Sequence, residues 1–363
     1  MLYNLIQPKT ELARLHEIPK TFFEKIEDSK TFGNHLFPDW FEEVCGSLHG
    51  LEKKFKSLFE NYKAIGDIEA RKQIIKAFEI NNKVKELCDL SLTDREINKS
   101  AFPENIANDL DDIFHQLYHS TLEYDKFEAK VNTNVHEFIR LYIKLNKHSL
   151  CPFCGFYSCT YIKGEARLAL DHWLCKDYFP QASVNFSNLV PICEKCNKSP
   201  VKGNRIILDY PEGEVVRSKS LYPYLGHSGF QVKFSFHYIP STSDFSVVPF
   251  TLVITPINVD DNEVITNWKS VFNIQTRFES YLGETVFEMW ENNLEGYCTS
   301  NKLADKYDNL EFKSFLTKHK NNYYHKNNPG YRLNQAFWEY MINETDEPYV
   351  KSIYDNLKSK LNV

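Results

Sequence analysis

An acid and a histidine stand side by side in the stretch LDHWLCK, which runs from Leu170 to Lys176. Asp171 can bind a cation, and His172 can accept a proton near neutral pH because the ordinary pKa of imidazole is about 6.5. An isolated Asp-His dipeptide is usually structural. Whether this pair takes part in chemistry therefore depends on the residues around it.

Two CxxC pairs bracket this stretch, Cys151 with Cys154 and Cys193 with Cys196. Each pair places two thiolates within reach of one ion, which is typical of a structural tetrahedral zinc site. A simple zinc ribbon has about 15–20 residues between its pairs. Here there are 38, so we expect a further element between them. Four buried free cysteines are the alternative, which the paired spacing disfavours.

The inserted segment has a characteristic order. Alternating residues in ARLALDHW predict a strand that ends on the Asp-His pair, a long loop follows, NLVPIC predicts a second strand, and EKCNKS begins a helix. This order, clasped by two CxxC pairs, resembles the HNH endonuclease family with its ββα-metal core. The resemblance covers Cys151 to Gly203 and rests on the Asp-His dipeptide, the Asn-Leu before the second CxxC pair, and the sequence Cys-x-x-Cys-Asn.

The resemblance implies a role for each polar residue of the core. His172 would be the general base that takes a proton from the attacking water. Asp171 and Asn197 would bind a single catalytic divalent ion, Mg²⁺ or Mn²⁺, and Asn188 would orient the loop and the base. The four cysteines would hold a structural Zn²⁺.

The residue types also suit phosphodiester hydrolysis on chemical grounds. A neutral imidazole can activate water, and a carboxylate with an amide oxygen suits Mg²⁺, which prefers oxygen ligands. Neighbouring residues of a strand point to opposite faces, so Asp171 can bind the ion while His172 faces the water. Cys196 adjoins Asn197, so a zinc ion would fix the helix that carries a ligand of the catalytic ion.

The chain also departs from the family pattern. The family often has proline at the position of Cys175 and has Lys-Gly soon after the Cys-Asn. In CNKSPVKG, Lys202 and Gly203 come later, and we expect Pro200 to lie in the first helical turn, where proline is tolerated. The phosphate-binding role is therefore left open between Lys198 and Lys202.

Charge and composition restrict the possible partners. The chain has 363 residues and a net charge of -6, so any contact with nucleic acid must come from a local basic patch. Residues 151–205 supply one, with 7 Lys and Arg against 4 Asp and Glu. The N-terminus lacks an apolar signal segment, and no apolar run reaches the ~18 residues of a membrane span. We therefore expect a cytoplasmic protein, in which CxxC pairs favour metal over disulfides.

The expected fold class is α+β, a mainly helical protein with a central zinc-clasped ββα-metal (HNH) core and a small antiparallel β-hairpin region. Residues 1–146 would form a helical N-terminal domain. The nuclease core with its zinc-binding cysteines would span 147–210. Residues 211–363 would form a C-terminal β-hairpin plus helical region.

Hydrophobic periodicity underlies this division. Apolar residues recur at helical spacing in 67–90, 134–145 and from 261 onward, and Asn134 with Glu137 predicts a helix start. Strict alternation over 230–238 predicts a half-buried strand, and 247–255 is its expected partner.

The leading hypothesis is a metal-dependent HNH endonuclease that hydrolyses DNA. The core looks most like HNH proteins of bacterial anti-phage defence, such as the nuclease subunit of Septu-type systems, which works beside an ATPase. The chain has no GxxxxGK[ST] loop, so the ATPase would be a partner protein. Two alternatives stay open. One is an HNH nuclease acting on RNA, and the other is a non-catalytic zinc-stabilised scaffold that binds nucleic acid or protein.

Overall fold

The structure, a computed structural model, describes residues 5–46, 50–147, 149–159, 170–208, 217–226, 230–238, 250–283 and 328–343, with a few isolated positions between 296 and 318. The chain divides into two compact units. The N-terminal unit comprises Asn4–Cys151 and Ser158–Gly229, and the C-terminal unit comprises Met1–Tyr3, Pro152–Tyr157 and Phe230–Val363. The three-segment division predicted from the sequence stays a prediction.

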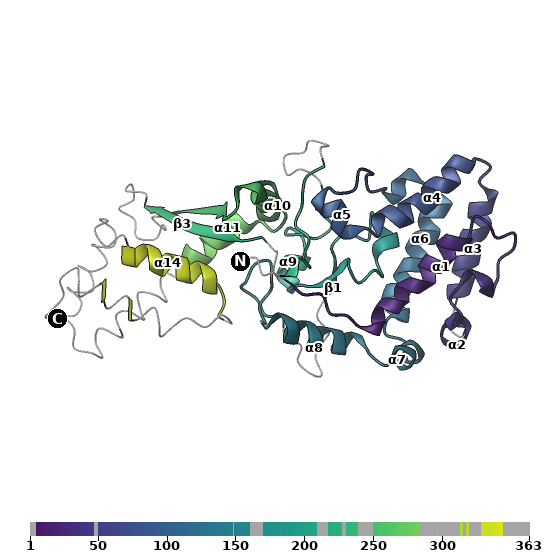
Figure 1. The fold of residues 1–363 in the computed structure, drawn as a ribbon, viewed down its shortest axis with the longest axis horizontal. Helices are drawn as coiled ribbons and strands as arrows, with labels where there is room; N and C mark the ends of the chain where they lie inside the picture. The colour runs from purple at the N-terminus through teal and green to yellow at the C-terminus, as the bar shows by residue number, and fades with distance from the viewer. Residues whose placement is uncertain are drawn as a thin grey trace. The chain divides into compact units, whose positions relative to one another are not determined.

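The N-terminal unit is mainly helical, and its longer helices pack around one apolar core (Figure 1). Each helix buries one apolar stripe, as amphipathic helices do. On α3, for example, Phe55, Leu58 and Tyr62 are fully buried. The helices are α1 (Glu17–Lys25), α2 (Phe41–Cys45), α3 (Leu51–Ala64), α4 (Ile68–Asn81), α5 (Val84–Asp89), α6 (Glu104–Gln116), α7 (Asp125–Val131) and α8 (Val135–Asn146).

The helix predicted over 67–90 is two helices, α4 and α5, and the helix predicted over 134–145 is α8. The break after α4 falls at Asn82, whose side-chain Nδ2 donates to the carbonyl of Phe78 at 2.8 Å. Such local bonds compete with continued helix. At the start of α8, Asn134 accepts from the backbone N–H of Glu137 at 2.9 Å, so the predicted capping is confirmed.

The first sheet has two short antiparallel strands, β1 (Leu170–His172) and β2 (Leu189–Pro191), with Asp171 opposite Val190. A 3-10 turn, η5 (Pro180–Ala182), lies in the loop between them. The one-turn helix α9 (Glu194–Asn197) follows β2. Strand, long loop, strand and helix thus occur in the predicted order. Residues 166–169 of the predicted first strand lie outside the described residues.

The C-terminal unit contains the second antiparallel sheet, β3 (Val232–Tyr238) paired with β4 (Phe250–Pro256). The predicted alternation is confirmed, since Val232, Phe234 and Phe236 are buried while Lys233 and His237 are exposed. Residues 247–249 of the predicted partner strand lie outside the described residues.

Three described helices complete this unit: α10 (Asn262–Val271), α11 (Ile274–Tyr281) and α14 (Tyr331–Asn343). The helical stretch from 261 is divided at Asn273, which has a left-handed backbone (φ 49°). Helix α14 packs on β3 (Figure 1). Phe153 of the first CxxC loop stacks on Phe272 with ring centroids 4.8 Å apart. The rest of the predicted C-terminal helical region lies outside the described residues.

The described residues thus form a mixed fold, mainly helical with two small antiparallel sheets, as the predicted fold class requires at this coarse level. None of the described helices has the length and apolar character needed to span a membrane.

Candidate functional site

The four cysteines of the two CxxC pairs come together. The sulfur atoms of Cys151, Cys154, Cys193 and Cys196 all lie within 4.8 Å of one another, and all four residues are buried and outside any disulfide bond. In a tetrahedral site with Zn–S bonds of about 2.3 Å, the sulfurs lie about 3.8 Å apart. The predicted convergence is confirmed, and the cluster could hold a metal ion such as zinc.

A tight turn brings the second pair together. Cys193 is the N-cap of α9, and its carbonyl accepts from the backbone N–H groups of Cys196 (3.0 Å) and Asn197 (3.1 Å). The helix ends after one turn because Lys198 is extended. The carbonyl of Cys196 then accepts from the backbone N–H of Lys202 at 3.1 Å. This bond holds the backbone of Lys202 against the turn that contains Cys193 and Cys196.

Asp171 lies buried on β1 with an exposed fraction of 6%. The Lys202 ammonium donates to its Oδ1 at 3.1 Å and to the carbonyl of His172 at 2.9 Å. Oδ2 lies 2.9 Å from the same nitrogen but receives no well-angled hydrogen bond. Burial raises the pKa of the Asp171 carboxyl, and the positive charge of Lys202 opposes that shift. Oδ2 is therefore a buried carboxylate oxygen with capacity for a further ligand.

His172 is held in one orientation at the end of β1. Its Nε2 lies 3.1 Å from the carbonyl oxygen of Ser183. A carbonyl only accepts, so this contact assigns the proton to Nε2 and leaves the lone pair on Nδ1. Burial, followed by the charges of Lys176 and Lys202, lowers the pKa of His172 to about 3. The imidazole is therefore neutral at pH 7, but a pKa this far below 7 makes it a weaker base than an imidazole with the ordinary value.

Asn188 connects the two ends of the loop between β1 and β2. It is fully buried, its Oδ1 accepts from the N–H of Leu174 (2.6 Å), and its Nδ2 donates to the carbonyls of Leu174 (3.1 Å) and Ala182 (3.2 Å). Its own carbonyl accepts from the N–H of Trp173 at 2.7 Å. These bonds fix the loop that carries Ser183, and the role of Asn188 in orienting the base stays a prediction.

The remaining predicted residues are more dispersed. Asn197 is partly exposed at the end of α9, and within the described structure no hydrogen bond links its side chain to Asp171. Lys198 is exposed and pairs with Glu194 on the same helix. Lys202 is 1% exposed, so its ammonium faces Asp171 and not the solvent. The roles of Asn197 as an ion ligand and of either lysine as a phosphate ligand stay predictions.

Tyr118 is a site neighbour that the sequence did not predict. It lies on a π-helical turn, η4 (Leu117–Thr121), directly after α6. Its hydroxyl donates to the carbonyl of Leu170 at 2.8 Å, and its ring centroid lies 4.3 Å from that of His172. Turns of this kind are frequent at functional sites. No periodicity or motif indicates this contact.

A second unpredicted contact supports the loop from the side of α4. The side chain of Asn185 donates to the carbonyl and to the Oδ1 of Asn82, at 3.0 and 3.1 Å. In return, Asn82 donates to the carbonyl of Gln181 at 3.2 Å. The segment that holds Ser183 against His172 is therefore fixed at both ends, by Asn188 and by Asn82.

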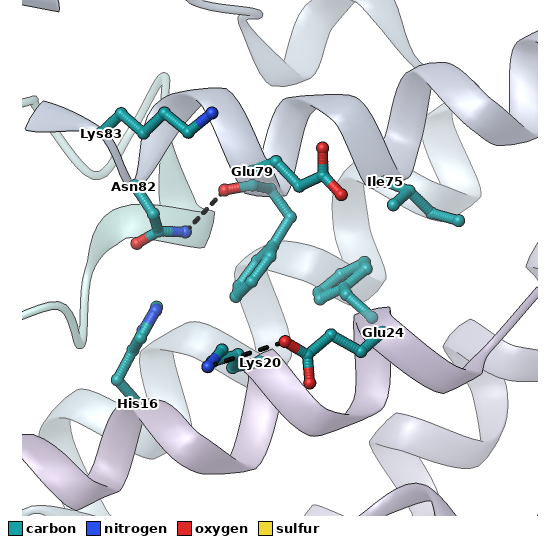
Figure 2. Close-up of a pocket in the computed structure, with 9 residues that line it drawn as sticks. His16, Lys20, Glu24, Ile75, Glu79, Asn82 and Lys83 are labelled. Atoms are coloured by element: carbon teal, nitrogen blue, oxygen red, sulfur yellow. Dashed lines mark hydrogen bonds and ion pairs between the residues drawn. The ribbon is translucent and has the colours of Figure 1, made fainter. Parts of the chain in front are cut away.

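A separate pocket of about 280 Å³ lies between α1 and α4 (Figure 2). His16 stacks on Phe78 with ring centroids 5.5 Å apart, and its Nδ1 is buried without a hydrogen-bond partner. Burial lowers the pKa of His16 to about 4, and Lys20, which pairs with Glu24 at 3.6 Å, adds to this shift. None of the predicted site residues lines this pocket.

Comparison with known families, curated proteins and solved structures finds no match to this chain. Any functional interpretation therefore depends on the residues and on their geometry.

Proposed function

We propose that the protein is a metal-dependent HNH endonuclease that hydrolyses phosphodiester bonds in DNA, with His172 as the general base. One observation carries the proposal: Asp171 and His172 are adjacent on a short strand that pairs with a second strand, and a one-turn helix within a four-cysteine cluster follows. This is the order of elements and residues on which the resemblance to HNH endonucleases depends.

The tautomer and orientation of His172 support its proposed role. With its proton on Nε2 and donated to Ser183, the imidazole can take the proton of an attacking water on Nδ1. The resulting imidazolium would keep its bond to the Ser183 carbonyl, so the ring would not need to turn between the two states. Asn188 and Asn82, which fix the loop around Ser183, would be positioning residues.

Asp171 and Asn197 would hold the catalytic Mg²⁺ or Mn²⁺. Oδ2 of Asp171 suits an oxygen-preferring ion because it is buried and receives no hydrogen bond. When bound, such an ion supplies a Lewis acid for the phosphate and stabilises the departing oxygen. The ammonium of Lys202 already lies against this carboxylate, so it would share Asp171 with the ion or move away from it.

The four cysteines would hold a structural Zn²⁺. Cys196 immediately precedes Asn197, and the carbonyl of Cys196 accepts from the N–H of Lys202. The cysteine cluster would therefore fix the position of Asn197, the proposed ion ligand, and of Lys202, whose ammonium contacts Asp171.

Plasmid nicking tests the proposal. Supercoiled plasmid is incubated with the full chain and Mg²⁺ or Mn²⁺, beside His172→Ala. We expect the wild-type chain to nick DNA, and the variant to be slower by at least ~100-fold, the usual contribution of a general base. His237→Ala is the matched control, since His237 is exposed on β3. Nicking by His172→Ala at the wild-type rate would remove His172 as the base.

A second candidate function is the zinc-stabilised scaffold without catalysis. It is favoured by the burial of Asp171 and His172, which are 6% and 7% exposed and already have partners in Lys202 and Ser183. A chain that contains zinc but cleaves neither DNA nor RNA under any of these conditions would support it. Cleavage of RNA alone would retain the nuclease but change its substrate.

The partner ATPase and the anti-phage setting depend on the narrower sequence resemblance, and they stay predictions. Co-purification of the chain with an ATPase encoded beside it is the direct test.

A further inference from the structure

Three side chains that carry or can acquire positive charge lie together next to β1. The Lys176 ammonium lies 3.1 Å from Nε2 of His119, and the rings of His119 and His115 have centroids 4.3 Å apart. The three residues come from different elements: His115 from the last turn of α6, His119 from η4, and Lys176 from the loop after β1. Both histidines are exposed and Lys176 is partly exposed. We call these three residues the cationic cluster.

Tyr118 connects the cationic cluster to Asp171 and His172, the proposed catalytic residues. The Lys176 ammonium lies 5.8 Å from the centroid of the Tyr118 ring, and the edge of that ring meets His119 with centroids 5.0 Å apart. The same ring contacts His172, and its hydroxyl is bound to the carbonyl of Leu170. The cationic cluster is therefore held at a fixed position beside the end of β1.

The electrostatic surroundings favour an anion at this position. The carboxylate nearest along the chain, Asp177, accepts a hydrogen bond from Asn204. The whole chain has a net charge of -6, so a positive cluster at its surface is a local exception to the long-range field.

We infer that Lys176, His119 and His115 form a binding site for a phosphate group of a DNA backbone, next to the phosphate that is cleaved. The inference rests on the proposed nuclease function for the identity of the ligand. A lysine ammonium and imidazole N–H groups are donors that bind phosphate oxygens and position a nucleic acid without reading its sequence.

The shape of the site favours a backbone over a free phosphate ion. A small anion is usually enclosed by its donors, whereas these three side chains lie at the surface and come from three elements. A polymer that passes over the surface can contact such a group with one phosphate while the next reaches His172. Bound nucleic acid would also separate the Lys176 ammonium from the His119 ring by accepting a hydrogen bond from each.

Binding can be measured without cleavage. A fluorescein-labelled DNA duplex is titrated with the full chain without added Mg²⁺ or Mn²⁺, at several salt concentrations, for the wild type and for Lys176→Gln/His119→Gln. We expect the double variant to bind about 10-fold more weakly, with a salt dependence reduced by about one released counterion for each charge removed. Zinc content and melting temperature show whether the variant is folded.

Lys56→Gln is the matched control, because Lys56 is an exposed lysine of α3 that pairs with Glu60. It should bind DNA with unchanged affinity and salt dependence. Equal binding by the wild type and the double variant would overturn the inference. The inference would also be overturned if millimolar inorganic phosphate displaced DNA from the wild type and from the double variant equally well.

Failure of this inference is distinguishable from failure of the nuclease proposal. Nicking that requires His172 but is unchanged in the folded double variant would overturn the phosphate site alone. DNA binding that requires the cationic cluster, in a protein that nicks nothing, would support the site and overturn the nuclease. The same dependence seen with an RNA duplex, but not with DNA, would overturn the assignment of DNA as the ligand.

Discussion

The two antiparallel strand pairs in the described part of the chain bury their residues in opposite ways. In β3, burial alternates, so that Phe234 and Phe236 face the core while Lys233 faces water. In β1 and β2 all six residues are buried, and Asp171 and His172 are among them. The pair β3–β4 thus needs only one apolar face, whereas β1–β2 must supply internal partners for polar groups that are largely shielded from water.

The partners differ accordingly. The buried face of β3 is covered by rings, with Phe234 5.9 Å from Phe278 and Phe236 5.3 Å from Phe337, measured between centroids. The polar groups of β1 instead contact the ammonium of Lys202 and the carbonyl of Ser183. Apolar packing tolerates small changes of shape, but a buried charge that loses its partner has no substitute. The comparison therefore predicts that single substitutions affect the β1–β2 region more strongly.

The largest effect is expected at the cysteine cluster, which stands beside β2 in the chain. Cys193→Ser removes one of four thiolates, and we expect bound zinc to fall from about one per chain to near zero. Structural zinc contributes about 10–16 kcal/mol to the folding of small zinc domains, so the β1–β2 region should unfold or become protease-sensitive. Metal analysis and limited proteolysis measure the two effects.

Cys45→Ala provides the control, since Cys45 is a buried cysteine of α2 outside the cluster. It should keep its zinc and lose only the stability that a small cavity costs. Zinc lost from Cys193→Ser without any change in proteolysis would contradict a structural role for the cluster, and equal zinc loss in both variants would remove the cluster as its site.

The next largest effect is expected at the buried ion pair. Lys202→Met removes the ammonium while keeping most of the side-chain volume, and it leaves the Asp171 carboxylate buried without a counter-charge. Breaking one partner of such a pair costs about 3–5 kcal/mol. Urea denaturation should show this loss, and Asp171→Asn/Lys202→Met should recover part of it because no charge is then left unpaired.

The double variant makes this prediction specific. If Lys202→Met and the double variant lose the same free energy of unfolding, the lysine acts through packing and not through the carboxylate. If Lys202→Met lowers the free energy of unfolding by less than about 0.5 kcal/mol, the ion pair does not stabilise the fold. Many exposed ion pairs behave in this way.

The same contrast explains what the sequence could predict. Periodicity predicts α8 and the alternation of β3 because each pattern reports burial of one face of one element. The CxxC spacing predicts the cysteine cluster because two pairs of thiols at this spacing are typical of a tetrahedral metal site. The turns at Asn82 and Asn273, which divide two predicted helical stretches, are decided by local side-chain bonds and backbone conformation that periodicity does not record.

The contacts of the candidate site were less accessible to prediction. Tyr118 bonds to Leu170 across 52 residues, and Asn185 bonds to Asn82 across 103. Such pairs depend on how helices pack, and no spacing within a single element indicates them. Lys202 was predicted as a residue of the site, but only the folded chain shows that its ammonium faces Asp171.

The smallest effect is expected on β4, where two neighbouring residues lie on opposite faces. Ile254 is 4% exposed and stands opposite Phe234, whereas Thr255 is exposed. Ile254→Val removes one buried methylene and should cost about 0.5–1.5 kcal/mol. Thr255→Val changes a side chain of the same shape in water and should stay within about 0.5 kcal/mol. Urea denaturation of both variants measures the difference. Equal costs would mean that the two faces of β3–β4 are equivalent, and the contrast with β1–β2 would then lose its basis.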